Sequence, residues 1–328
     1  TIPPVFTTAL LEDKYRIASR DSLANYSFFM GASNDNLEEV MKVDVRKVCG
    51  LKIFMGSSTG NLLVDDEKTL DGLFARFPSL IATHCEDEAT ILKNAAVYKE
   101  KYGDDVPVRF HPLIRSEEAC FKSSSLAVSL AKKHGSRLHV LHISTARETT
   151  LFERAAPLDR KRITAEACIH HLVFNDSHYE RLGTLIKWNP AVKKASDQEG
   201  IFQALLDDRI DVVATDHAPH TLAEKDNTYF KAPSGGPLVQ HSLVAMLEFF
   251  HQAPAPSDVR GPFHRRMALH VDTAAVTEPE PHAVAVTTVR REVPVPQQRA
   301  QHDLPLLIAE PMRLGSHHPV AGIVDIIS

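Results

Sequence analysis

The segment "DVVATDHAPHTLAEK" (residues 211–225) carries the pattern that decides the fold. A mainly apolar run, typical of a buried strand, is followed at once by Asp216, His217 and His220. Similar runs occur earlier in the chain, at residues 25–31, 50–56, 79–86, 137–144 and 163–171. Near-continuous apolar runs of this length are typical of a parallel sheet that is covered on both faces.

Stretches with a helical period lie between several of these runs, at residues 87–103, 123–135 and 197–208. The first has an acidic start and Gly103 at its end, and the second offers cap candidates in Ser123–Ser125 and a stop at Gly135. Six strand–helix units in a row predict an α/β fold, a (β/α)8 TIM-type barrel with strands three to eight recognisable. A doubly wound sheet is the alternative, although no Gly-x-Gly-x-x-Gly follows any of the strands.

The composition excludes several classes of protein. The 328 residues are 43% hydrophobic and 24% charged, with a net charge of −5, which indicates a soluble globular protein and no nucleic-acid partner. No apolar stretch approaches the roughly 20 residues that span a bilayer, and the N-terminal residues do not resemble a secretory signal, so no membrane partner is expected. The four cysteines are scattered and form no Cys-x-x-Cys, which predicts reduced thiols and a cytoplasmic location.

The composition changes near residue 253. Residues 1–252 contain 17 lysines, whereas residues 253–328 contain none, together with 10 prolines and 6 histidines. A proline-rich linker with a small β appendage is one interpretation. We favour a second, in which the tail has a different origin through fusion or a shifted reading frame, because folding gives no reason to exclude every lysine. The expected domains are therefore a barrel over 1–252 and an atypical tail over 253–328.

Polar residues recur where the predicted strands end, namely Lys52, His84, His142 and Asp216. In a barrel these ends converge on the face where active sites lie. Imidazole and carboxylate groups are suitable zinc ligands, and a lysine becomes one if CO2 carbamylates its amine. Each residue alone has a structural interpretation, as a buried lysine, a core histidine or a helix cap, but the four together favour a metal site.

Other histidines have weaker claims. Of His139 and His142, which lie three residues apart, one is expected to be structural. The pair His170 and His171 is expected to line the rim of the barrel. The pair His317 and His318 lies in the tail and is given no role.

Several strings together resemble the bacterial dihydroorotases of the amidohydrolase superfamily. They are "LKIFMGSSTGN", "THCEDE", "RSEEAC", "LHVLHISTARE", "KWNPAVK" and "ATDHAPHTLAEK", spread over residues 1–252. Allantoinases and dihydropyrimidinases share the metal frame, so the frame alone implies hydrolysis of a cyclic amide. The Asp-His-Ala-Pro-His string favours dihydroorotase, which interconverts dihydroorotate and N-carbamoyl-aspartate in pyrimidine biosynthesis.

The resemblance implies two zinc ions per active site. Lys52 resembles the carbamylated lysine that bridges the metals, and His84 and His142 resemble the histidines of the more exposed metal. Asp216 resembles the aspartate that binds the more buried metal and shuttles a proton as the catalytic acid and base.

The resemblance also implies substrate-binding residues. His220 resembles the histidine that holds the substrate carboxylate, and Asn189 corresponds to a contact with the ring. His217 is expected to support the loop through a hydrogen bond. The implied partner is this small-molecule substrate, and the family allows a homodimer.

The chain departs from the family pattern at its start. It contains no His-x-His, the pair that gives the buried metal two ligands, so we expect the activity of this chain to be weak or absent. The alternatives are an allantoinase or dihydropyrimidinase-like cyclic amidase, and a non-catalytic dihydroorotase homologue that acts as a partner or scaffold.

Overall fold

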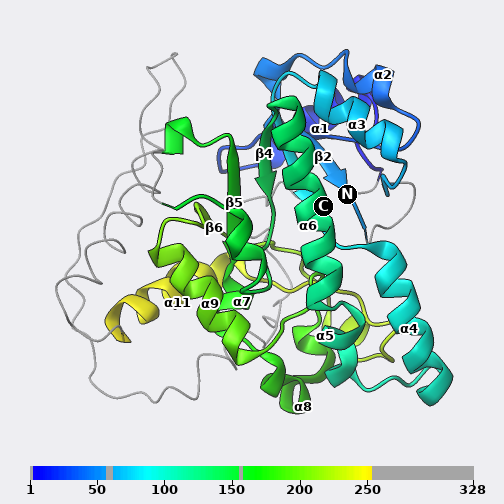
Figure 1. The fold of residues 1–328 in the computed structure, drawn as a ribbon, viewed down its shortest axis with the longest axis vertical. Helices are drawn as coiled ribbons and strands as arrows, with labels where there is room; N and C mark the ends of the chain where they lie inside the picture. Colours follow the sequence, from blue (N-terminus) through cyan, green and yellow to red (C-terminus); the bar gives the residue numbers. More distant parts are fainter. Residues whose placement is uncertain (1–2, 57–61, 155–157, 253–328) are drawn as a thin grey trace.

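The computed structural model describes residues 3–56, 62–154 and 158–252. They form an α/β fold in which parallel strands are accompanied by helices (Figure 1). The predicted tail, residues 253–328, lies outside the described residues. Among the helices of the described ranges, none is both long and apolar enough to cross a membrane.

All six predicted strands are present. They are β1 (Phe29–Gly31), β2 (Gly50–Phe54), β3 (Leu80–His84), β4 (Arg137–Val140), β5 (Ile163–Cys168) and β6 (Val212–Ala214). Each strand pairs in parallel with the next one along the chain, in the order β1-β2-β3-β4-β5-β6. A doubly wound sheet reverses its strand order at a switch point, and this sheet does not. The strand order is therefore that of a TIM-type barrel, as predicted.

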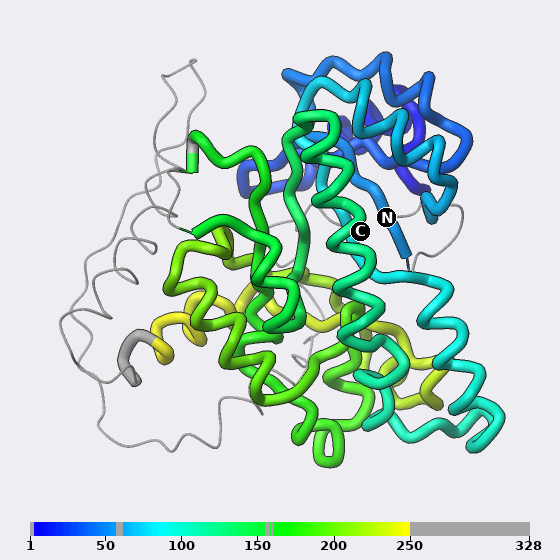
Figure 2. The backbone as a smooth tube through the Cα atoms, in the orientation of Figure 1, coloured from blue at the N-terminus to red at the C-terminus, as the bar shows by residue number. Residues whose placement is uncertain are grey.

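The helices that alternate with these strands cover the sheet (Figures 1 and 2). The described α-helices are α1 (Thr8–Asp21), α2 (Leu37–Val40), α3 (Glu67–Arg76), α4 (Glu88–Tyr102), α5 (His111–Ile114), α6 (Glu117–His134), α7 (Ile169–Val173), α8 (Tyr179–Leu182), α9 (Ala195–Leu206), α10 (Leu222–Lys225) and α11 (Val239–Gln252). Figure 2 shows that α1, α2 and α3, in blue and cyan, gather at one end of the molecule.

The three predicted helices correspond to α4, α6 and α9, but the start of α6 was wrong. Ser116 caps α6 by accepting a hydrogen bond from the Ala119 amide, so Ser123–Ser125 lie inside the helix. The two acidic residues of the first turn, which favour a helix N-terminus, support the earlier start. The predicted stop is confirmed, because Gly135 adopts the left-handed conformation (φ 65°) that favours glycine.

The strands end earlier than their apolar runs suggest. β4 stops at Val140, and the chain then turns through His142, whose φ is 37°. β5 stops at Cys168 because residues 169–173 fold into α7. Apolar character continues beyond both strands because the following residues are buried too, so hydrophobicity alone overestimates strand length.

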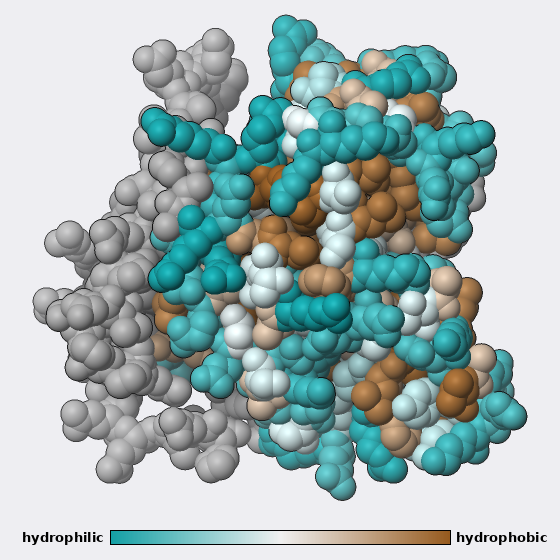
Figure 3. All heavy atoms as spheres, in the orientation of Figure 1, coloured by the Kyte–Doolittle hydropathy of each residue, from teal (hydrophilic) through white to brown (hydrophobic). Residues whose placement is uncertain are grey.

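The core lies between the sheet and the helices. The side chains of Met30, Leu51, Ile53, Ile81 and Leu138, all from the strands, are completely buried. On the face shown in Figure 3, apolar side chains appear between largely hydrophilic ones. Only glycine fits at the start of β2, because φ at Gly50 is 154° and a Cβ atom there would lie 2.2 Å from the Leu80 carbonyl oxygen.

Candidate metal and substrate site

Lys52, the predicted lysine ligand, was expected at a strand end, but it lies in the middle of β2. Its side chain is buried, with the amine 4.4 Å from the centroid of the Phe54 ring, and no hydrogen-bond partner is described for Nζ. Burial lowers the pKa of Lys52 to about 8, although the Asp216 and Glu166 carboxylates act to raise it. Part of the Lys52 population is therefore a neutral amine near neutral pH, which is the form that reacts with CO2.

The two predicted histidine ligands contact each other. His84 is the last residue of β3 and His142 follows β4, and the adjacent parallel strands bring the Nδ1 atom of His84 within 3.0 Å of the Nε2 atom of His142. Two nitrogen ligands of one tetrahedral zinc lie about 3.3 Å apart, because each Zn–N bond is about 2.0–2.1 Å long. The spacing of this pair is therefore close to that of two imidazoles on one metal ion.

An acidic residue that the sequence reasoning missed orients the first histidine. The Glu86 carboxylate lies 2.9 Å from Nε2 of His84 and also pairs with the Arg115 guanidinium. Burial acts to raise the pKa of Glu86, but Arg115 and His84 outweigh it and bring that pKa to about 2. The ionised carboxylate accepts the Nε2 proton of His84, which leaves Nδ1 to face His142. Glu86 stands two residues after His84 in the string "THCEDE". This spacing was the only local sign in the sequence that the two side chains lie on the same side of the strand.

The predicted aspartate ligand follows β6 directly. Asp216 interacts electrostatically with the Lys52 amine across the sheet. Its φ is 48°, and His142 shows a similarly positive φ. Such backbone conformations cost non-glycine residues roughly 1–2 kcal/mol and are concentrated at functional sites. Two of the four predicted ligands are thus held in conformations that the surrounding fold must enforce.

The donor types suit a zinc site, but the described residues do not complete one. His84, His142 and Asp216 carry groups that zinc accepts, and the buried Lys52 amine and Nδ1 of His142 have no described partner. Within residues 3–56, 62–154 and 158–252, no three or more His, Cys, Asp or Glu side chains converge on one metal position. The metal roles of these four residues therefore stay predictions.

The two predicted substrate residues are joined through Ser234. The Ser234 hydroxyl donates to Oδ1 of Asn189 at 3.0 Å, and the Ser234 carbonyl lies 3.2 Å from Nε2 of His220. Burial and the neighbouring Lys225 lower the pKa of His220, so its neutral imidazole donates to the carbonyl. The predicted support by His217 is confirmed, because its Nδ1 accepts the Val239 amide proton at 3.2 Å.

Of the other histidines near the predicted strand ends, His139 is half-buried, and His170 and His171 are buried. His139 is structural, as one of its pair was expected to be, and contacts Thr164 at 2.8 Å and Glu166 at 3.0 Å. The prediction that His170 and His171 line the rim was wrong, because α7 turns both into the core directly after β5. The His170 ring stacks on Trp188 with their centroids 4.6 Å apart.

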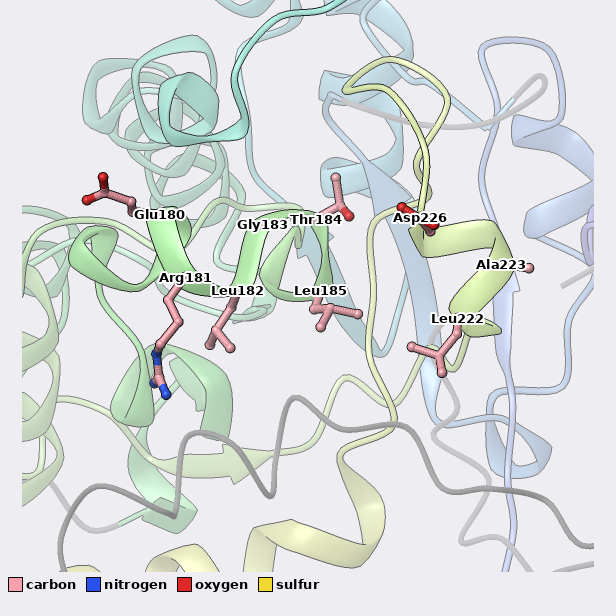
Figure 4. A pocket seen from close by; sticks show the side chains of 9 residues that line it. All are labelled: Glu180, Arg181, Leu182, Gly183, Thr184, Leu185, Leu222, Ala223 and Asp226. Carbon is pink, nitrogen blue, oxygen red and sulfur yellow. The ribbon is translucent and has the colours of Figure 1, made fainter.

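A pocket of about 570 Å³ lies between α8 with the following turn and α10 (Figure 4). Its lining residues are Glu180, Arg181, Leu182, Gly183, Thr184, Leu185, Leu222, Ala223 and Asp226. None of the six predicted site residues is among them. The pocket is therefore a surface feature beside the candidate site and is not the site itself.

Comparisons with known proteins agree with the resemblance found in the sequence. No protein-family model matches the chain. A dihydroorotase of Methanosarcina mazei is 28% identical over 256 residues, 75% of this chain and 55% of that protein. An allantoinase of Bacillus velezensis is 28% identical over 252 residues, with the same coverage of 75% and 55%. The chain thus spans about half the length of the curated relatives that it matches.

Solved structures show the same architecture. An L-hydantoinase from Arthrobacter aurescens aligns with a TM-score of 0.71 and 23% identity, covering 79% of this chain and 59% of that one. A dihydroorotase from Saccharomyces cerevisiae, in complex with 5-fluoroorotic acid, aligns with a TM-score of 0.59 and 14% identity, covering 80% and 74%. These structures show that the chain shares their fold. The resemblance to dihydroorotases found in the sequence is confirmed, because several curated relatives carry that name.

Proposed function

We propose that this chain carries the catalytic part of a zinc-dependent dihydroorotase, which interconverts dihydroorotate and N-carbamoyl-aspartate. The contact of 3.0 Å between His84 and His142 is the observation that carries the proposal. The family names of the relatives support the choice of a cyclic amide as the substrate class. A cytoplasmic location, a homodimer and the division into a barrel over 1–252 and a tail over 253–328 are part of the same proposal.

The metal would be held by His84, His142 and Asp216, together with Lys52 as its carbamate. When bound, zinc ions supply a water of lowered pKa and polarise the scissile carbonyl. The burial that keeps Lys52 partly neutral favours the carbamate, because only the free amine reacts with CO2. Glu86 fixes the ring of His84 so that Nδ1 points to the metal position.

The proton and the substrate are handled by Asp216 and His220, which follow β6, and by Asn189, which precedes α9. Asp216 takes a proton from the attacking water and delivers it to the ring nitrogen that leaves, a role that requires a carboxylate within reach of both. His220 binds the carboxylate of the substrate and Asn189 contacts the ring. Ser234 holds these two residues in one surface through its hydroxyl and its carbonyl.

The direct test is hydrolysis by the purified chain, supplied with zinc and bicarbonate. Dihydroorotate, allantoin and dihydrouracil are compared, because only dihydroorotate carries a ring carboxylate. Metal analysis gives the zinc content of the wild type and of His142→Ala, with His139→Ala as a control outside the proposed ligand set. We expect weak turnover of dihydroorotate, because the chain contains no His-x-His, and loss of zinc in His142→Ala alone. Zinc retained in His142→Ala would contradict the assignment of ligands.

Allantoinase is the second candidate, because an allantoinase matches the chain as extensively as the dihydroorotase does. Preferential hydrolysis of allantoin would favour it. A chain that binds neither zinc nor any of the three substrates would instead be the non-catalytic homologue.

A further inference from the structure

Two buried lysines, Lys187 and Lys225, have no task in the proposed reaction. Their side chains are 8% and 4% exposed. Lys187 precedes Asn189 by two residues, and Lys225 ends α10, five residues after His220. Lysine is seldom fully buried unless its ammonium group is hydrogen-bonded. The hydrogen-bond partners of these two amines therefore indicate what their burial serves.

Both amines donate to backbone carbonyl groups of one segment, residues 229–235. The Lys187 amine lies 2.7 Å from the carbonyl oxygen of Tyr229 and 2.6 Å from that of Ala232. The Lys225 amine lies 3.0 Å from the carbonyl oxygen of Pro233 and 2.9 Å from that of Gly235. An ammonium group has three N–H donors, so each lysine can satisfy several carbonyls that would otherwise be buried without partners.

The same contacts tie this segment to the strand-end residues. The Lys225 amine also reaches the carbonyl oxygen of Lys187, at 3.2 Å, and that carbonyl accepts the Gly235 amide proton at 2.9 Å. Ser234 lies between Pro233 and Gly235, whose carbonyls Lys225 binds, and it joins Asn189 to His220. The two lysines therefore lie directly behind the proposed substrate surface.

The charge of the pair favours an anion in front of it. The described acceptors of both amines are carbonyl oxygens, which hydrogen-bond an ammonium group without cancelling its charge. Burial lowers the pKa of Lys187 to about 8, and burial with the neighbouring Lys187 lowers that of Lys225 to about 7, so the charged form of each amine is disfavoured until an anion nearby offsets it. Positive charge in a poorly solvated site raises the local potential and attracts a carboxylate.

We propose that Lys187 and Lys225 are positioning residues that hold residues 229–235 in place, so that Asn189, Ser234 and His220 form a subsite for an anionic ring substituent. The proposal deepens the proposed function and rests on it for the identity of the ring. It assigns to the pair a preference for a ring with a carboxylate over the same ring without one.

We call Lys187, Lys225 and the segment they hold, residues 229–235, the lysine clamp. The single tryptophan of the chain allows this clamp to be observed without a measurement of catalysis. Trp188 lies between Lys187 and Asn189, and its ring centroid is 5.9 Å from the Lys225 amine. Fluorescence quenching of Trp188 by acrylamide reports the solvent access of this segment. Calorimetric titration with orotate and with uracil, which lacks the carboxylate, reports the subsite.

The variants are Lys225→Met, which removes the donors, and Lys225→Gln, which keeps part of them. Lys231→Met is the matched control, because Lys231 is an exposed lysine of the same segment. We expect Lys225→Met to weaken orotate binding about tenfold, to leave uracil binding nearly unchanged and to increase quenching of Trp188. Lys225→Gln should fall between Lys225→Met and the wild type, and Lys231→Met should match the wild type.

Each outcome decides the proposal. Unchanged orotate binding and quenching in a folded Lys225→Met variant would overturn it, and so would equal weakening of orotate and uracil or failure of the wild type to bind orotate. If Lys225→Met does not fold, as judged by circular dichroism, the same comparison is made with Lys225→Gln. Lys225→Met could lose the preference for orotate over uracil while the wild type fails to hydrolyse dihydroorotate. This result would support the clamp and refute the proposed function.

Discussion

The ion pair behind the first histidine gives the sharpest prediction about stability. The Glu86 carboxylate is completely buried and the side chain of Arg115 is 13% exposed. Arg115→Met removes the guanidinium group and leaves the carboxylate with His84 as its remaining described partner. Removing one partner of a buried pair costs about 3–5 kcal/mol, because the other charge stays desolvated. We expect a loss of about 3 kcal/mol at pH 7, since Arg115 is partly exposed.

The pH dependence provides an independent check. The pKa of Glu86 is about 2, against an ordinary value of 4.5, so the folded state favours the ionised form by about 3 kcal/mol. Because the folded pKa is the lower one, this stabilisation is complete above pH 4.5 and is lost as the pH falls from 4.5 towards 2. Arg115→Met should raise the pKa of Glu86 in the folded state. The free energy of unfolding should then depend less on pH between pH 4.5 and pH 2.

Urea unfolding, followed by circular dichroism between pH 3 and pH 7, measures both effects. Arg154→Met is the control, because its pair with Asp207 is 64% and 36% exposed and such pairs contribute at most about 1 kcal/mol. The reasoning would be refuted if Arg115→Met lost no more unfolding free energy than the control and if its stability between pH 3 and pH 4.5 changed with pH as in the wild type.

Three further predictions follow from single residues. Lys52→Met should abolish zinc binding yet keep or raise the melting temperature, because the buried amine has no described partner; a fall of the melting temperature would contradict this. Gly56→Ala should destabilise the fold by about 2–4 kcal/mol in urea titrations, because a Cβ atom would lie 1.8 Å from the carbonyl oxygen of Glu86; a neutral effect would show that the strand end yields. Ser116→Ala should cost about 1 kcal/mol on removal of the α6 cap, whereas Ser123→Ala should not act through capping; comparison of their unfolding midpoints decides between the two caps.

The fold could be predicted from the sequence because its signals are local. The six apolar runs and the helical stretches between them each reflect burial and periodicity within a few residues, and they sufficed for a parallel barrel-type sheet. The boundaries were less accurate where burial continued past a strand, as at His142 and in α7. The start of α6 was missed because serines are common both at caps and inside this helix.

Part of the candidate site could likewise be predicted from the sequence, and part of it could not. The residue types of Lys52, His84, His142 and Asp216 are written in the sequence, and so are the strand-end positions of the last three, since parallel strands place their carboxyl ends on one face. The burial of Lys52 and the contact of 3.0 Å between the histidines were decided by tertiary structure. Arg115 is 29 residues from Glu86, so no local pattern could show their pairing.

The lysine clamp shows the same limit most plainly. Lysine normally indicates a solvated surface, and a sequence cannot show that an amine is buried and surrounded by carbonyl groups. The Lys187 amine binds the carbonyls of residues 42 and 45 positions away, and the Lys225 amine reaches back 38 positions to Lys187. The sequence by itself therefore determined the strands, their order and the chemical groups at their ends. Only the tertiary structure decided which groups meet, because burial and hydrogen bonding between distant segments depend on how the whole chain packs.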